Sequence, residues 1–246
     1  CYALKMINKR ILTTAIFLFS GLFAFAQDAA PAKKVAARPD IPGNFLVDLG
    51  LNLGINPPDS AYKKGLFGSR ALNLYYYYPI RLGGSKFSFN PGIGMSMERI
   101  KWANLRILRD TTANEEIYSL IPNTEYLKLK KSMLIMNYLE VPLEFRFDAN
   151  PADPARTFWV SFGARVGILA DAHSKLKFKR DGEKSMLKEH WRHGVSPVRY
   201  AAVLRWGVAG FGWFTAYNLT PLFEKGKGPS RTDMSILTVG ITINGL

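Results

Sequence analysis

Residues 133–148 alternate between apolar and polar side chains over a longer run than an ordinary strand. The apolar side holds Met133, Ile135, Leu139, Val141, Leu143, Phe145 and Phe147, with Asn137 as its one polar member, and the other side holds Tyr138, Glu140, Glu144, Arg146 and Asp148. A β-strand points successive side chains to opposite faces, so this run predicts a strand with one apolar and one charged face. Most strands have about five or six residues. A run this long predicts one wall of a small transmembrane barrel, with its apolar face in lipid.

Seven further runs alternate in the same way, and all eight together predict an all-β protein. The expected strands cover residues 44–55, 69–80, 86–100, 133–148, 157–169, 198–209, 211–220 and 234–244. The connections are long at 56–68, 101–131, 170–197 and 221–233, and short at 81–85, 149–156 and 210. Short turns alternating with long loops are typical of bacterial outer-membrane barrels, and loops this long are unusual inside a compact soluble domain. We therefore predict that residues 44–246 form an eight-stranded antiparallel up-and-down transmembrane β-barrel.

Residues 1–26 have the features of an export signal that follows a few upstream residues. Lys9 and Arg10 precede the apolar stretch 11–25, which is too short for a stable membrane span. The tripeptide Ala24-Phe25-Ala26 has the form of a signal-peptidase cleavage site. We predict a cleaved signal peptide here.

Residues 27–43 are rich in Ala, Pro, Lys and Arg without periodicity and predict a flexible periplasmic lead-in. Cys1 is the only cysteine and precedes the signal peptide, so we expect neither a disulfide nor a cysteine metal site in the mature chain. An exported chain built from long strands predicts a location in the bacterial outer membrane.

The alternation alone does not say which face of each strand meets lipid. A soluble β-sandwich or an exported lipocalin-like barrel would bury the same apolar rows and expose the polar rows to water. The polar rows favour lipid outside, because they combine small residues with charges of both signs and contain almost no lysine. We expect these charges to pair inside a filled barrel. The expected interior network consists of Asp48, Glu98, Glu140, Glu144, Arg146, Arg165, Arg199 and Arg205.

Aromatic residues gather near the ends of the expected strands. The set contains Tyr75, Tyr76, Tyr77, Tyr78, Trp102, Phe158, Trp159, Tyr200, Trp213 and Tyr217. Such residues form girdles at the two membrane interfaces of outer-membrane barrels, and we expect the same here.

Signals for catalysis or metal binding are weak, and we predict no catalytic residue, no metal and no cofactor. An alternative is a rim-active lipid A hydrolase or acyltransferase in which His173 and Ser174 form a nucleophile pair with Asp171 as the acid. His190 and His193 are spaced so that they could share a metal, but the sequence suggests no further ligand.

The segment 170–197 is strongly basic. Its expected basic outer loop contains Lys175, Lys177, Lys179, Arg180 and Lys184. The nearest anions outside a bacterial outer membrane are lipopolysaccharide phosphates, which the loop is expected to contact; the alternative is a solvated loop face. The chain carries a formal charge of +14, but nucleic acid is a poor partner for an exported barrel.

Two segments resemble one protein family. Asn137-Tyr138-Leu139-Glu140-Val141-Pro142-Leu143 resembles the Y-L-E-[IV]-P-L strand of the PorT-like outer-membrane β-barrel family of Bacteroidota. The segment 217–229 resembles the S-L-T-P-L-F-x-x-G-K-G-P sequence before the last strand of such proteins. The family is mostly of unassigned function, and its namesake is linked to type IX secretion and gliding. These barrels commonly end in an aromatic residue, whereas this chain ends Asn244-Gly245-Leu246, which implies a missing residue or two or a degenerate assembly signal.

The function expected from these features is that of a non-enzymatic, monomeric outer-membrane barrel. A structural, adhesive or accessory role is expected, with secretion as one form of it. Its partners would be outer-membrane lipid, lipopolysaccharide and a protein of the cell envelope. The alternatives are the rim-active lipid A enzyme and the soluble exported binding barrel.

Overall fold

The structure is a computed structural model. It describes residues 43–57, 68–102, 105–110, 117–122, 129–153, 156–180, 183–190, 192, 194–227 and 233–245. The expected signal peptide and almost all of the expected lead-in lie outside these residues. No helix among the described residues is long and apolar enough to cross a membrane.

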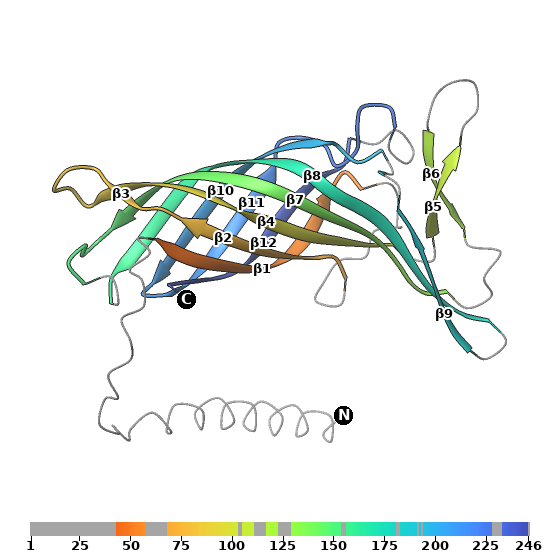
Figure 1. Cartoon of the computed structure of the whole chain (residues 1–246), viewed down its shortest axis with the longest axis horizontal. Helices are drawn as coiled ribbons and strands as arrows, with labels where there is room; N and C mark the ends of the chain where they lie inside the picture. Colours follow the sequence, from red (N-terminus) through yellow and green to blue (C-terminus); the bar gives the residue numbers. More distant parts are fainter. Residues whose placement is uncertain are drawn as a thin grey trace, which may run out of the picture. The chain divides into compact units, whose positions relative to one another are not determined.

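Eight strands close into one antiparallel barrel (Figure 1). They are β1 (Asn44–Ile55), β2 (Arg70–Tyr77), β4 (Phe87–Trp102), β7 (Leu129–Asp148), β8 (Phe158–Arg180), β10 (Val198–Val208), β11 (Phe211–Asn218) and β12 (Ser235–Asn244). Each pairs with the next of these strands along the chain, and β12 pairs with β1 to close the barrel. The prediction of an eight-stranded up-and-down barrel is therefore confirmed.

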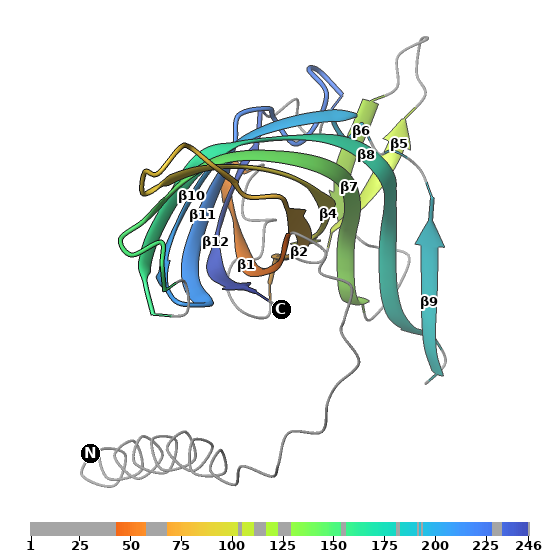
Figure 2. The ribbon, with the colours of Figure 1, turned by 60° about the vertical axis from the view of Figure 1, so that its left-hand side comes forward.

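The apolar rows point out of the barrel and the polar rows point in. In β7, Leu139, Val141, Leu143 and Phe145 are 54%, 46%, 41% and 44% exposed, whereas the alternating Glu140 and Glu144 are buried. No second layer of described residues covers the outer face, and Figure 2 shows the strands curving around one interior. The lipocalin-like and sandwich alternatives, which need these rows buried, are therefore wrong.

The barrel has two unlike ends. At the short-turn end, β3 (Ile80–Arg81) pairs with β4, and the turn between β10 and β11 consists of Ala209 and Gly210. At the long-loop end, β7 and β8 continue past the other strands, and β9 (Glu183–Glu189) pairs with the extension of β8 (Figure 1). A separate two-stranded sheet contains β5 (Leu105–Asp110) and β6 (Ile117–Pro122).

The expectation that 101–131 and 170–197 are long unstructured loops is therefore wrong. The cause in β8 is a bulge: Asn137 pairs with Asp171 and Tyr138 with Leu169, so Ala170 is an extra residue. A bulge reverses the in-and-out alternation, and the period of two that marked the strand stops there. Beyond the bulge, the outward residues of β8 are no longer apolar and include Lys175 and Lys177.

Candidate functional site

The interior near the short-turn end is filled by a group that we call the Arg205 cluster. It consists of Asp48, Asn73, Tyr77, Glu144, Ser161 and Arg205. Arg205 Nη2 donates to Asp48 Oδ2 at 2.7 Å, and Nη1 donates to Glu144 Oε1. Tyr77 donates to Glu144 at 2.6 Å and Asn73 to Asp48 at 3.2 Å. Two carboxylates share one guanidinium, and the neutral donors supply further hydrogen bonds to them.

A second group, the Arg199 cluster, lies nearer the long-loop end. It consists of Tyr75, Glu98, Glu140, Arg165 and Arg199. Arg199 Nη1 lies 2.7 Å from Glu98 Oε1, and the same guanidinium binds Glu140. Arg165 donates to the Tyr75 hydroxyl at 2.9 Å, and that hydroxyl donates to Glu140. Two carboxylates and two guanidiniums balance here, and all four side chains are buried.

The two clusters bring together seven of the eight residues expected in the interior network. The eighth, Arg146, lies apart from them at the short-turn end. Arg146 Nε donates to Asp148 Oδ1 at 2.9 Å, and Arg81 donates to the same carboxylate at 3.1 Å. The Arg146 guanidinium also lies 4.4 Å from the ring centroid of Trp159. Asp148 was not among the expected network residues, although it has the same parity along β7 as Glu144.

The expected aromatic girdles are only partly present. Tyr75, Tyr77, Trp102 and Trp159 are all buried inside and are not interfacial, so their assignment was wrong. Among the outward residues, Tyr78, Phe158, Tyr200 and Trp213 are 46% to 54% exposed. The alternation could have revealed Tyr75 and Tyr77, because both share the parity of the inward Asn73.

An apolar cap closes the interior at the long-loop end. It is the buried cluster of Ile100, Trp102, Leu134, Met136, Tyr138, Ala172, Val195, Leu222, Phe223, Met234 and Ile236. Backbone hydrogen bonds hold the covering segments together, from Ser196 N to Leu222 O at 3.0 Å and from Leu222 N to Met234 O at 2.7 Å. Tyr138 donates to Ser196 O at 2.8 Å and so ties the cap to the wall. The Y-L-E strand and the T-P-L-F segment, which carry the family resemblance, meet in this cap.

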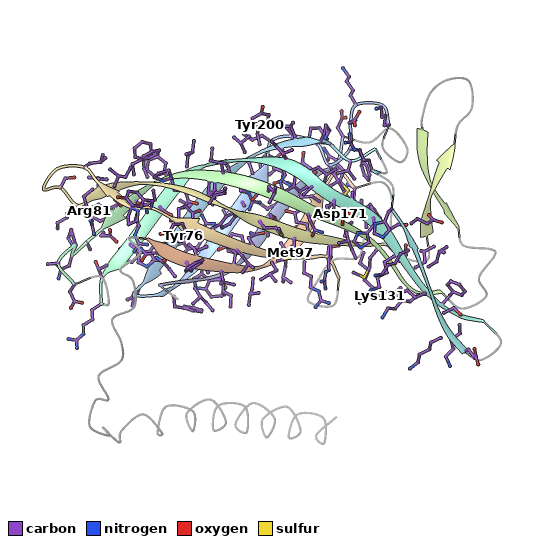
Figure 3. The ribbon with its side chains drawn as sticks, in the orientation of Figure 1. Tyr76, Arg81, Met97, Lys131, Asp171 and Tyr200 are labelled. Carbon is purple, nitrogen blue, oxygen red and sulfur yellow. The ribbon has the colours of Figure 1, made fainter. Side chains whose placement is uncertain are left out.

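The exposed apolar residues of the outer wall, such as Leu139 to Phe145 in β7 and Phe158 to Ile168 in β8, form an apolar belt. Cationic side chains lie on the outer wall just beyond this belt. This lateral basic surface consists of Arg70, Arg99, Lys101, Lys131, Lys175, Lys177 and Lys188. Arg70 pairs with Arg99, Lys131 with Lys177, and Lys175 with Lys188. Figure 3 shows Lys131 at the long-loop end and Arg81 at the other.

Neighbouring cations on the lateral basic surface help to lower the pKa of two of its lysines. Desolvation, followed by repulsion from Arg70 and Lys101, lowers the pKa of the Lys131 ammonium. Desolvation, followed by repulsion from Lys177 and Lys188, lowers the pKa of Lys175. An anion bound here would relieve this repulsion.

The expected basic outer loop is thus a β-hairpin. Lys175, Lys177 and Lys179 belong to β8, Lys184 to β9, and Arg180 ends β8 opposite Glu183. Sequence reasoning missed Arg70, Arg99, Lys101 and Lys131. They could have been found by extending the in-and-out alternation of each strand one or two residues past its last outward apolar residue.

A pocket of about 550 Å³ is lined by residues of β1, β2, β10, β11 and β12. Its lining includes Leu49, Leu51, Trp213, Val239 and Ile241, and Arg70 lies at its long-loop end. The pocket thus places apolar side chains beside one member of the lateral basic surface.

The nucleophile pair considered for catalysis does not form. His173 and Ser174 are neighbours in β8, so they point to opposite faces; Ser174 is inside and 6% exposed. His173 Nδ1 does lie 2.8 Å from Asp171 Oδ2 on the outer face. His190 lies beside His173 with ring centroids 5.0 Å apart, and its expected partner His193 lies outside the described residues.

No family model and no curated protein sequence matches this chain. Among solved structures, Ail, the attachment invasion locus protein of Yersinia pestis, is 15% identical over 83% of this chain and 99% of that one, with a TM-score of 0.35. The N-terminal β-barrel domain of Pseudomonas aeruginosa OprF is 7% identical over 82% and 97%, with a TM-score of 0.25. A mutant porin of Rh. blastica is 9% identical over 82% and 99%, with a TM-score of 0.21. At these low scores, the fold assignment rests on the strand register of this chain.

Proposed function

We propose that this protein is a non-enzymatic barrel of the bacterial outer membrane that holds lipopolysaccharide against its outer wall through phosphate contacts. The lateral basic surface carries the proposal, because it lies on the same outward face as the apolar belt and directly beyond it. A lipid whose acyl chains lie along the belt would present its headgroup at that height.

The dimensions of the belt support a membrane location. The ten residue steps from Phe158 to Ile168 in β8 cover about 33 Å of strand at about 3.3 Å per residue. A tilt of about 40° reduces this to about 25 Å, the height of the apolar band in outer-membrane barrels. Exposed residues fill the belt on neighbouring strands too, from Leu139 to Phe145 in β7 and from Val198 to Val208 in β10.

The filled interior argues against a diffusion channel. The Arg205 cluster, the Arg199 cluster and the cap follow one another along the interior, and the cavity beside Arg205 and Glu144 has only about 20 Å³. An eight-stranded barrel has little space beyond its own side chains. The chemistry open to partners is therefore on the outer wall and the loops.

Charge and shape together favour a phosphorylated lipid as the partner. Each Lys or Arg near an anionic membrane surface contributes about 1 kcal/mol of attraction. The pocket adds apolar side chains beside the Arg70 cation, which suits an acyl chain of a lipid with an anionic headgroup. This supports lipid A phosphates more than a soluble polyanion, which would gain nothing from the pocket.

The membership of the PorT-like family remains a proposal on the resemblance alone. The meeting of its two motif segments in the cap supports a structural role for those motifs. A monomer is favoured because the eight barrel strands form a closed ring in which each has a partner on both sides.

Binding of lipid A with and without its phosphates tests the proposal. The folded barrel in neutral detergent is titrated with each lipid, and Lys131→Gln with Lys175→Gln is compared with Lys86→Gln with Lys225→Gln, which removes equal charge elsewhere. We expect roughly 30-fold weaker binding of phosphorylated lipid A by the first pair, from two contacts of about 1 kcal/mol each, and no change in the control. Equal binding by all three proteins, or of both lipids, would contradict the proposal.

A further inference from the structure

We propose that Asp171, His173 and His190 bind one divalent transition-metal ion, of the Zn²⁺ class, on the outer wall at the base of the β8–β9 hairpin. One potential ligand atom from each of the three residues lies within 4.8 Å of the other two. Figure 3 labels Asp171 at the long-loop end, where the strand extension begins.

Two features of the fold bring the three ligands together: the bulge in β8 and the register between β8 and β9. Asp171 and His173 are two residues apart in β8 and share its outer face, because the bulge at Ala170 resets the alternation just before them. His190 directly follows β9, and the register of Ser174 with Glu189 continues to place it opposite His173. Positions i and i+2 of one strand, with the cross-strand neighbour of one of them, converge on one point above the sheet.

The spacing is close to that of a tetrahedral site. Zn²⁺ binds imidazole nitrogen and carboxylate oxygen at about 2.0–2.1 Å, which separates tetrahedral ligand atoms by about 3.3 Å. His173 Nδ1 lies 2.8 Å from Asp171 Oδ2, and His190 Nδ1 lies 3.8 Å from Asp171 Oδ1. The two distances end on different oxygens of the Asp171 carboxylate. A metal would therefore have to bring one ligand atom of each residue from within 4.8 Å of the others to about 3.3 Å, by side-chain rotation at these partly exposed residues.

The donor set selects the metal class. Two imidazoles and one carboxylate suit Zn²⁺ and its transition-metal neighbours, whereas Ca²⁺ and Mg²⁺ prefer oxygen ligands throughout. Three protein ligands leave one position for water or an external anion. The Asn137 amide donates to Asp171 Oδ2 at 3.2 Å and so helps to orient the carboxylate.

A simple hydrogen bond between Asp171 and His173 does not account for His190. That imidazole is 67% exposed, yet its ring lies against His173 at 5.0 Å and an interplanar angle of 35°. Lys175 and Lys188 are the next outward pair along the hairpin and repel a cation. We therefore expect weaker binding than at a buried structural zinc site.

A bound metal would link the C-terminal end of β9 to β8. Within the described residues, β9 pairs only with β8. The metal would hold the hairpin closed where that pairing ends, and it would stabilise the closed hairpin in proportion to its occupancy.

The test uses the whole folded barrel in detergent, with Zn²⁺ titrated by calorimetry and Co²⁺ as a spectroscopic probe. We expect one equivalent of metal, a Co²⁺ absorption band of four-coordinate type, and slower proteolysis of the hairpin with Zn²⁺. His173→Ala and His190→Ala should each weaken binding at least tenfold. His193→Ala removes the same type of side chain, outside the described residues, and should leave binding unchanged; Asn137→Ala should weaken it less than the ligand variants.

Each variant is accepted only if it runs as the folded barrel on a gel without heating, which separates loss of metal from loss of fold. The proposal is wrong if the His173→Ala, His190→Ala double variant binds as much Zn²⁺ as the unaltered protein. It is also wrong if His193→Ala abolishes binding as fully as His190→Ala does.

Discussion

Arg205 Nη2 and Asp48 Oδ2 lie 2.7 Å apart inside the barrel, although 157 positions separate the two residues in the chain. The same guanidinium binds Glu144, so strands β1, β7 and β10 meet at one cation. The first, fourth and sixth strands of the barrel are thereby tied across its interior. The ion pairs set which face of each strand is inside, since a slip of one residue would turn these charges toward lipid.

Replacement of Arg205 by Met should strongly destabilise the barrel. It leaves the carboxylates of Asp48 and Glu144 buried without their cation, a loss that typically costs about 3–5 kcal/mol. The measurement is the urea midpoint of unfolding in detergent, followed by gel mobility. Arg156→Met, at an exposed turn residue, serves as the control and should change little. A stability equal to that of the control would mean that the ion pairs contribute little to the fold.

Phe223→Ala tests the cap. Phe223 is 1% exposed and packs in the apolar cluster, so its truncation should cost about 3–5 kcal/mol. Leu219→Ala is the matched control in the same connection, because Leu219 is 60% exposed. Planar-bilayer currents should stay at baseline in both variants, because the Arg199 cluster still fills the interior below the cap. A conducting Phe223→Ala barrel would show that the cap alone seals the interior.

A charge on the outer wall should cost most at the centre of the belt. Leu143 is the middle of the five outward apolar residues from Leu139 to Phe147, so Leu143→Arg should reduce folding stability in bilayers by about 2–4 kcal/mol. Phe87→Arg, near the short-turn end, should cost about 0–1 kcal/mol. Folding free energies in lipid vesicles measure both values. Equal costs at the two depths would argue against the assigned position of the belt.

The sequence was sufficient for the barrel because two signals agreed along most strands. Apolar rows of period two marked the walls, and the charges of opposite sign on the other rows marked the interior, since charges cannot remain unpaired there. Asp48, Glu140 and Arg205 were found in this way. The pairing of each carboxylate with a particular arginine depends on the shear of the closed barrel. The alternation of residues along the sequence does not give this shear.

Three features escaped prediction for physical reasons. The bulge at Ala170 ended the period of two in β8, so the extension of that strand was taken for a loop. Trp159 was assigned to the interface by its residue type, although its indole donates to the Ala209 carbonyl from inside at 2.7 Å. His190 reaches His173 only through the register of β9, and that strand was not predicted.

Removal of Lys131 should have opposite effects with and without a bound anion. Desolvation and neighbouring cations hold the pKa of Lys131 below its ordinary value, so the folded state binds fewer protons than the unfolded state. The free energy of unfolding therefore rises with pH in the alkaline window just below about 10.4. At neutral pH and low salt, Lys131→Gln should stabilise the barrel slightly, by about 0.5 kcal/mol or less after solvent screening.

With phosphorylated lipid A present, the same variant should be less stable than the unaltered protein, because a stabilising contact is lost. Thermal unfolding in detergent, with and without the lipid, measures both signs. The same sign under both conditions would contradict an anion site at Lys131.

The orientation of the strand faces is tested most directly by spin labels in lipid vesicles. A label at Val141→Cys, on the outer face of β7, should collide readily with oxygen dissolved in lipid and hardly at all with a water-soluble nickel complex. A label at Lys184→Cys, on the hairpin, should show the reverse. Access of the nickel complex to position 141, with little from oxygen, would place that face in water or protein and contradict the account.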